Sequence, residues 1–128
     1  MEATEPQIAT KNIKNVIVVT LLTPQLIEDT EIASLEQSLL QMIKKANVVN
    51  FVLNFENVIF LSSAVLRVLI KVNSAINEKR GKLRLCEIAS EILEVFKITR
   101  LNKVFDIRKD VDAAVESLQS CGIAAGKI

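Results

Sequence analysis

Two adjacent serines are the residues of this 128-residue sequence best placed for chemistry. Ser62 and Ser63 lie in the string FLSSAVLRVLI, residues 60–70, between two apolar stretches without Gly or Pro. A serine at the start of a helix can act as its N-cap, because the hydroxyl accepts a hydrogen bond from a first-turn amide. The same position can hold a phosphate, because first-turn amides and the helix dipole stabilise a dianion. The string alone leaves both roles open.

The spacing of the following residues predicts which way Ser63 faces. Ser63, Arg67, Lys71 and Ser74 occur at i, i+4, i+8 and i+11, which places them along one side of a helix. The regularly spaced apolar residues fall on the other side, so Ser63 is predicted to point outward. A phosphate there would add a dianion to a partner surface without unfolding the domain. Ser63 is therefore the first candidate for phosphorylation, and Ser62 is the second.

Other kinds of chemistry are excluded by residue types that the sequence lacks. There is no His, so imidazole-based triads and His-ligated zinc are excluded. The three Gly residues form no phosphate-binding loop, and without Trp and Tyr few rings could stack nucleic-acid bases. A net charge of +1 gives no field for gripping nucleic acid or an anionic membrane. We expect a binding protein with no enzymatic activity, cofactor or metal, and keep a ligand sensor or enzyme as an alternative.

The cysteines and the N-terminal residues indicate a compartment. Cys86 lies in the apolar run LRLCEI, far from Cys121, and a reduced thiol there behaves as a small hydrophobe. Residues 1–12 are polar and acidic, unlike a secretion signal. No apolar run approaches the roughly 18 residues of a membrane span. We therefore expect a cytoplasmic protein that has neither a membrane nor nucleic acid as a partner.

The two serines must be positioned by the surrounding strands and helices, whose sequence patterns alternate along the chain. Apolar runs predict strands, and spacings of three and four between apolar residues predict helices. The predicted strands are 16–22, 48–55, 82–88 and 104–107, with 7–13 as a further edge strand. The predicted helices are a segment within 24–47, residues 64–79, residues 90–98 and a last helix after Asp110. This order predicts an α/β fold: a mixed, mostly parallel sheet of four to five strands packed with about four helices.

Particular residues are expected to mark the ends of these elements. Ser90 and Asp110 are predicted N-caps of the last two helices. Gly81 is the predicted C-terminal stop of helix 64–79. Residues 1–13 are expected to be an N-terminal segment or edge strand, 14–120 a single domain, and 121–128 a frayed tail.

Two strings resemble the STAS domain of bacterial anti-sigma-factor antagonists. They are residues 51–70, FVLNFENVIFLSSAVLRVLI, and residues 82–107, KLRLCEIASEILEVFKITRLNKVFDI. The first resembles an apolar strand followed by the family pattern F-I/M-D-S-S-G-L-G, with Ser63 at the first Ser. In the second, Arg100 stands where Gly is usual. The other family residues that it keeps are Phe96, Thr99, Leu101 and Phe105.

The resemblance implies a partner and a switch. In the family, the first Ser of the motif is phosphorylated by a partner that is both anti-sigma factor and serine kinase, and a dedicated phosphatase removes the phosphate. The unphosphorylated form binds the partner and frees the sigma factor, so transcription is regulated. By resemblance, Ser63 is the phosphate acceptor here, although Ser62, Val65 and Arg67 replace the Asp and both glycines of the usual motif. The residues expected to contact the partner are Ser62, Ser63, Leu66, Arg67, Ile70 and Lys71.

A second hypothesis is a STAS scaffold without a phosphoswitch. Such a protein would assemble with itself or with other STAS proteins into a larger signalling complex. Leu66, Val68 and Ile70 flank the polar side of the predicted helix and would serve as contacts if exposed. The alternative is that they belong to the core, because the helix must press one broad side on the sheet.

Overall fold

The centre of the sheet includes two neighbouring apolar strands that are buried on both faces. The computed structural model describes residues 7–127, with side chains through residue 119. β2 (Val16–Leu21) and β4 (Asn50–Asn54) are parallel neighbours, with Val18 opposite Val52. Near-continuous burial of this kind is typical of parallel strands that helices cover on both sides.

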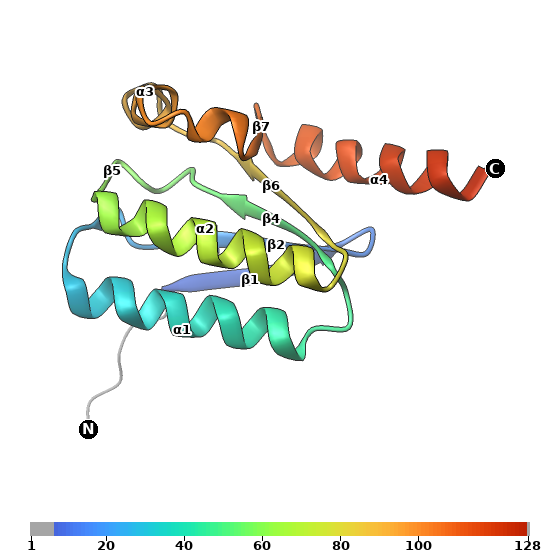
Figure 1. Cartoon of the computed structure of the whole chain (residues 1–128), viewed down its shortest axis with the longest axis horizontal. Helices are drawn as coiled ribbons and strands as arrows, with labels where there is room; N and C mark the ends of the chain where they lie inside the picture. The colour runs from blue at the N-terminus through green and yellow to red at the C-terminus, as the bar shows by residue number, and fades with distance from the viewer. Residues whose placement is uncertain (1–6, 128) are drawn as a thin grey trace.

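The main sheet has five strands in the order β1-β2-β4-β6-β7 (Figure 1). β1 (Ile8–Ile13) pairs antiparallel with β2 at one edge of the sheet. β6 (Lys82–Cys86) and β7 (Asp106–Arg108) extend it in parallel on the other side of β4. The predicted α/β class, with a mixed and mostly parallel sheet and about four helices, is confirmed.

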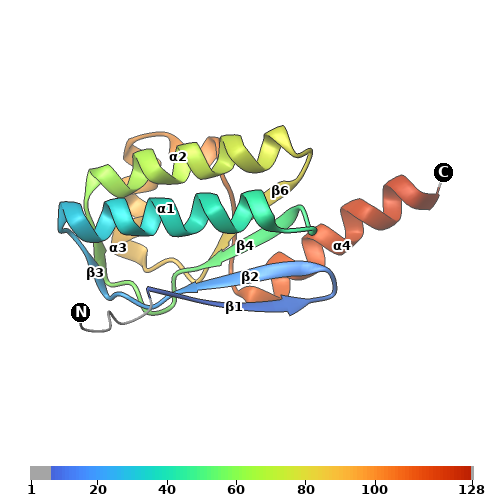
Figure 2. The ribbon, with the colours of Figure 1, turned by 90° about the horizontal axis from the view of Figure 1, so that it is seen from below.

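Helices cover both faces of this sheet (Figure 2). α1 (Asp29–Lys45) and α2 (Ser63–Glu78) pack side by side on one face. The first turns of α4 (Val111–Lys127) pack on the other face, against β2, β4 and β6. α3 (Ser90–Ile98) follows β6, and the short 3₁₀ helix η1 (Leu101–Lys103) connects it to β7.

The alternation of side chains along β4 divides the interior into two apolar clusters. Leu53 points into the larger cluster, beneath α1 and α2, whereas Val52 points into the smaller one, beneath α4. Both side chains are almost completely buried. Since successive strand residues face opposite sides, one short strand anchors both layers of helices.

The two predicted N-caps have different outcomes. The Asp110 prediction is confirmed, because its Oδ1 accepts a hydrogen bond from the Ala113 amide at 2.8 Å. The Ser90 prediction is wrong, because Ala89 occupies the N-cap position and Ser90 is already the first residue of α3. Ser90 therefore has helical backbone geometry, and no side-chain cap bond forms at this end.

Gly81 follows α2 as predicted, but for a different reason. The helix ends with two backbone bonds, from Arg80 to the Asn77 carbonyl at 2.9 Å and from Gly81 to the Ile76 carbonyl at 2.9 Å. This is the Schellman pattern, and its left-handed residue is Arg80, with φ 65°. A Cβ on Gly81 would lie 1.8 Å from the Val49 carbonyl oxygen, so space requires the glycine.

The structure contains two short strands and a helical extension that the sequence patterns did not predict. β3 (Gln25–Leu26) and β5 (Phe60–Leu61) pair in parallel as a separate two-stranded sheet. α4 continues to Lys127, through most of the segment 121–128 that was expected to be a frayed tail. Residue 128 lies outside the described residues, as do the first six residues of the expected N-terminal segment.

Candidate functional site

Ser63 is the first residue of α2 and its side chain is exposed. The chain reaches it from β5, which is held against β3 beyond the carboxyl end of β4. The Ser62 amide donates to the Leu26 carbonyl oxygen at 2.9 Å, which fixes the path of the chain into the helix. The first-turn amides of a helix point toward its N-terminus, as does the positive end of its dipole. A hydroxyl here is accessible and lies in a favourable field for a phosphate.

Ser62 differs from its neighbour in both backbone and side chain. It occupies the N-cap position of α2 with extended backbone angles, φ −89° and ψ 167°, but its side chain makes no cap bond. Its Oγ is buried and has no hydrogen-bond partner among the described residues. The side-chain hydrogen bond that would cap α2 is therefore absent. The Ser62 hydroxyl is also not presented to solvent. Ser63 is the more accessible of the two.

The polar side of α2 is arranged as the spacing predicted. Arg67, Lys71 and Ser74 are all exposed, in line with Ser63. Lys71 Nζ lies 3.2 Å from Glu36 Oε2 on α1, so this cation is held toward the neighbouring helix. Exposed pairs of this kind contribute little to stability, which leaves both side chains available for exchange with a partner.

Of the apolar residues considered on α2, only one lies at the surface. Leu66 is 6% exposed and belongs to the larger core, as does Val68. Leu66 therefore offers little surface to a partner, because one broad side of α2 must cover the sheet and Leu66 falls within it. Ile70 is 42% exposed and remains available.

A shallow groove runs between the amino-terminal halves of α1 and α2. It has a volume of about 240 Å³ and begins beside Ala64, the residue after Ser63. Arg67 and Lys71 line it from α2, and Asp29 and Glu36 line it from α1. Both signs of charge therefore lie within one short groove next to Ser63, which suits a polar protein surface better than a small apolar ligand.

A hydrogen-bonded loop connects the end of β4 to this site. Asn54, which is 4% exposed, donates through Nδ2 to Thr20 Oγ1 at 3.3 Å and to Glu56 Oε1 at 3.1 Å. Its Oδ1 accepts the Glu56 amide at 3.0 Å. These bonds fix the turn that follows β4, and with it the start of β5 and α2.

Exposed apolar side chains near Ser63 were missed by the sequence reasoning. Ile59 is 62% exposed and Phe60 is half exposed, and both precede Ser63 by a few residues. Ile27, which follows β3, is also exposed. The amides of Ile59 and Phe60 both donate hydrogen bonds to the Pro24 carbonyl oxygen, which holds the backbone of these two residues in place. The sequence shows the apolar run VIFL, but which of its side chains are exposed depends on the pairing of β5 with β3.

Among the described residues, the cysteine at position 86 lies in an environment that keeps its thiol protonated. Burial, together with the smaller effects of the negative charges of Glu87, Asp110 and Glu56, raises the pKa of the Cys86 thiol to about 12. A thiol with that pKa is protonated at neutral pH and is a poor nucleophile. Among the described residues, no three His, Cys, Asp or Glu side chains gather to hold a metal ion. Within the same part of the chain, no helix combines the length and apolarity needed to cross a bilayer.

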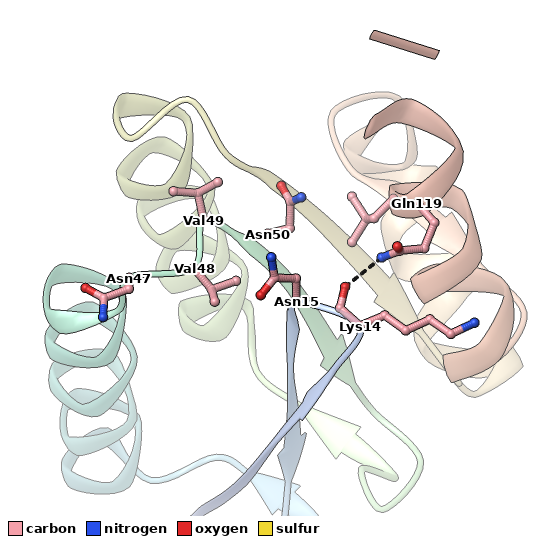
Figure 3. Close-up of a pocket in the computed structure, with 8 residues that line it drawn as sticks. Lys14, Asn15, Asn47, Val48, Val49, Asn50 and Gln119 are labelled. Carbon is pink, nitrogen blue, oxygen red and sulfur yellow. Dashed lines mark hydrogen bonds between the residues drawn. The ribbon is translucent and has the colours of Figure 1, made fainter. Parts of the chain in front are cut away.

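A second hollow lies at the opposite end of the sheet (Figure 3). It has a volume of about 490 Å³ and is bordered by the β1–β2 turn, the start of β4 and α4. In the two-residue turn, Lys14 and Asn15 both have positive φ. Gln119 Nε2 donates to the Lys14 carbonyl oxygen at 2.9 Å, which ties α4 to this turn. Since β4 begins here and Ser63 lies beyond its carboxyl end, this hollow is separate from the serine site.

Comparisons with known proteins agree with this architecture. The family model described as the STAS domain matches residues 7–114. This chain is a member of the STAS domain family. No curated protein matches the sequence at a significant level.

Solved structures with this STAS fold include anti-sigma factor antagonists. A STAS domain protein described as an anti-sigma-factor antagonist from Planctomyces limnophilus superimposes with a TM-score of 0.79 at 20% identity, covering 88% of this chain and 97% of that one. An anti-sigma factor antagonist from Mycobacterium paratuberculosis gives 0.74 at 19% identity, covering 88% and 92%. The Bacillus cell fate determinant SpoIIAA in its phosphorylated form gives 0.65 at 14% identity, covering 86% and 97%. At these identities the likeness establishes the fold.

Proposed function

We propose that this STAS domain is an anti-sigma-factor antagonist that phosphorylation of Ser63 switches off. In its unphosphorylated form it binds an anti-sigma factor with serine kinase activity in the cytoplasm, and so frees a sigma factor for transcription. A serine phosphatase restores the binding form. The protein itself carries out no catalysis. The observation that carries the proposal is the exposed Ser63 side chain at the first position of α2.

The surroundings of Ser63 support a switch that acts on binding and leaves the fold intact. The Ser63 side chain is exposed, so a phosphate on it would extend toward solvent and not into the core. Arg67, one turn further along the same side of α2, adds a positive charge near the new dianion. The dianion would become part of the surface that this chain offers to the partner, which includes the exposed Ile59 and Phe60. Burying a dianion against an apolar surface costs binding free energy.

Two solved structures give the proposal its partner class. SpoIIAA has been solved in its phosphorylated form, and the M. paratuberculosis protein is named as an anti-sigma factor antagonist. Both have the same fold as this chain. Transfer of their named roles to this chain is part of the proposal.

The test is to map the phosphate. The protein is incubated with ATP and an anti-sigma factor kinase, and the product is analysed by intact mass and peptide sequencing. We expect one phosphate, at Ser63, and none in Ser63→Ala. Ser74→Ala is the matched control, because Ser74 is an exposed serine on the same side of α2. Modification at another residue, or none with any such kinase, would remove Ser63 from the mechanism.

Binding of the partner gives a second readout. Ser63→Asp is expected to weaken binding of the anti-sigma factor by at least about tenfold, which is ~1.4 kcal/mol. Its melting temperature should stay near that of the unmodified protein, because the substituted side chain is exposed. A Ser63→Asp variant that binds as tightly as the parent protein would contradict a switch of this kind.

A further inference from the structure

The amino edge of the sheet, where β2, β4 and β6 begin, carries exposed basic side chains from three neighbouring segments. These bases, here called the basic edge, lie in the β1–β2 turn, in the last turn of α1 and around the turn from α2 into β6: Lys14, Lys44, Lys45, Arg80 and Lys82. Two acids lie near them, Glu116, which pairs with Lys14 at 3.6 Å, and Glu78 at the end of α2. No other member of the basic edge forms a salt bridge with the described residues. The edge therefore has an excess of positive charge, which the helix dipole explains only for the two bases that end α1.

Hydrogen bonds hold these segments beside one another. Lys79 Nζ, just after α2, donates to the Ala46 carbonyl oxygen, just after α1, at 2.8 Å. The Lys82 amide donates to Asn50 Oδ1, at the start of β4, at 3.1 Å. Lys14 and Asn50 line the same hollow, between the β1–β2 turn and α4 (Figure 3). The bases of the three segments therefore lie along one continuous surface.

The hollow beside the basic edge has a lining rich in side-chain amides. Asn15, Asn47, Asn50 and Gln119 line it, and Figure 3 shows Asn15 and Asn50 between the other two. Within the described part of the chain, only two atoms of these four amide groups form hydrogen bonds: Asn50 Oδ1 accepts the Lys82 amide, and Gln119 Nε2 donates to a carbonyl oxygen. A side-chain amide both donates and accepts, as does a peptide group. The hollow is therefore suited to hydrogen bonding with an extended backbone.

The charges and the amides together fit an acidic peptide better than other anions. Asp and Glu carboxylates form charge-assisted hydrogen bonds with Lys and Arg, while the backbone between them pairs with the side-chain amides. Nucleic acid fits less well, because no aromatic side chain lines the hollow to stack on bases. A lipid surface also fits less well, because none of the large exposed apolar side chains of the described residues lines the hollow.

We propose that the basic edge and the hollow beside it bind an acidic peptide segment of a partner protein. The carboxylates of the segment pair with the bases, and its backbone crosses the hollow. Because the bases are exposed, much of the attraction is screened by added salt. The surface lies at the opposite end of β4 from Ser63, so it is available in both the phosphorylated and the unphosphorylated protein.

The first experiment titrates a fluorescein-labelled hexaglutamate peptide with the full chain, at low and high salt, and follows anisotropy. We expect binding that salt weakens, and none to a hexaserine peptide. Arg80→Gln with Lys82→Gln should raise the dissociation constant at least about fivefold, because two charge pairs are lost. Arg100→Gln with Lys103→Gln is the matched control, because both residues are exposed bases outside the basic edge and Arg100, like Arg80, has a positive φ. No binding of hexaglutamate, or an equal loss in both double variants, would overturn the proposal.

The second experiment tests the side-chain amides. Asn47→Ala should raise the dissociation constant for hexaglutamate about threefold at both salt concentrations, because a hydrogen bond between neutral groups is not screened. The difference made by Arg80→Gln with Lys82→Gln should instead shrink as salt rises. Asn102→Ala, at an exposed asparagine in η1, is the matched control. An Asn47→Ala variant that binds like the parent protein would show that the backbone of the peptide does not cross the hollow, and would overturn that assignment.

The remaining measurements test other occupants of the basic edge. An oligothymidylate, vesicles containing phosphatidylglycerol and the protein alone are compared under the same conditions. Tighter binding of the oligonucleotide or the vesicles than of hexaglutamate would overturn the proposal, as would self-association that Arg80→Gln with Lys82→Gln abolishes. No kinase is present, and Ser63→Asp should bind hexaglutamate as the parent protein does, so failure here leaves the Ser63 proposal unaffected.

Discussion

Two neighbouring hydroxyls at the start of α2 have opposite environments. The Ser62 backbone is extended and its Oγ points into the protein, whereas Ser63 is the first helical residue and faces solvent. The helical spacing from Ser63 to Ser74 was sufficient to predict the exposure of Ser63, since spacing determines which residues share a side. The position of the Ser62 hydroxyl depends on how β5 docks on β3, which no local pattern specifies. That is why capping by the serine pair was a reasonable expectation from sequence and is nevertheless absent.

An acidic residue on β7 provides a pH-dependent contribution to stability. Asp106 Oδ1 lies 2.6 Å from Arg108 Nε, and Asp106 Oδ2 lies 3.4 Å from Arg84 Nε. The hydrogen bond from Arg108 lowers the pKa of Asp106 below its ordinary value of 3.8, burial opposes this, and the charges of Arg84 and Arg108 lower the pKa further. A carboxyl whose pKa is lower when folded stabilises the fold above its unfolded-state pKa. That contribution is lost as the pH falls through the folded-state value.

We therefore predict a pH-dependent effect of Asp106→Asn. At neutral pH it should lower the free energy of unfolding by no more than about 1 kcal/mol, because the pair is partly exposed to solvent. The difference from the parent protein should shrink below pH 3.8 as Asp106 itself becomes protonated. Urea unfolding followed by circular dichroism, from neutral to strongly acidic buffers, measures both. Arg108→Ala should remove most of this acid dependence, and an Asp106→Asn difference that is constant with pH would contradict the assignment.

At the scale of elements, two residues at the end of α2 share roles that one glycine often combines. One residue adopts the left-handed backbone conformation, and the other leaves room for a close backbone contact. Arg80 adopts the left-handed conformation, which costs a residue with a Cβ about 1 kcal/mol or more. Gly81 needs no unusual φ but has no room for a side chain, because of the Val49 carbonyl. The sequence predicted that Gly81 ends the helix, whereas the left-handed residue is Arg80, one position earlier. Both positions lie at the helix end, and only their backbone angles distinguish them.

Substitutions at these two neighbours should have opposite effects. Arg80→Gly is predicted to raise the free energy of unfolding by up to about 1 kcal/mol, because it relieves the left-handed strain. Gly81→Ala is predicted to lower it by about 3 kcal/mol, because the added methyl group must displace the backbone at Val49. Thermal and urea unfolding of both variants measures the two changes in the free energy of unfolding. A stabilising Gly81→Ala, or a destabilising Arg80→Gly, would show that the two roles had been assigned to the wrong positions.

The longer elements were predictable and the short ones were not. β2, β4 and α2 have apolar patterns that local sequence determines, and Asp110 caps α4 as expected. β3 and β5 have two residues each and exist only because they pair with one another. Their pairing exposes Ile59 and Phe60 beside Ser63, so the part of the candidate site that depends on tertiary contacts was the part missed.

At the scale of the whole molecule, the two faces of the sheet are joined through β4. The larger cluster includes Leu53 and the buried sides of α1 and α2, and the smaller includes Val52 and α4. The same strand ends at Asn54, whose bonds to Thr20 and Glu56 hold the loop that leads toward Ser63. A change in either cluster is therefore transmitted to the strand that supports the site.

This connection predicts that the domain unfolds as one unit. Leu53→Ala should cost about 3 kcal/mol, because it opens a cavity in the larger cluster. Val52→Ala should cost about 2 kcal/mol, the loss expected for two buried methyl groups. The chain has no Trp or Tyr, so far-UV circular dichroism and calorimetry are suitable probes. Both variants should retain a single transition in which the calorimetric and van't Hoff enthalpies agree. Two separate transitions in Val52→Ala would mean that the α4 face folds independently of the face that carries Ser63, because loss of the smaller cluster would then leave the larger one intact.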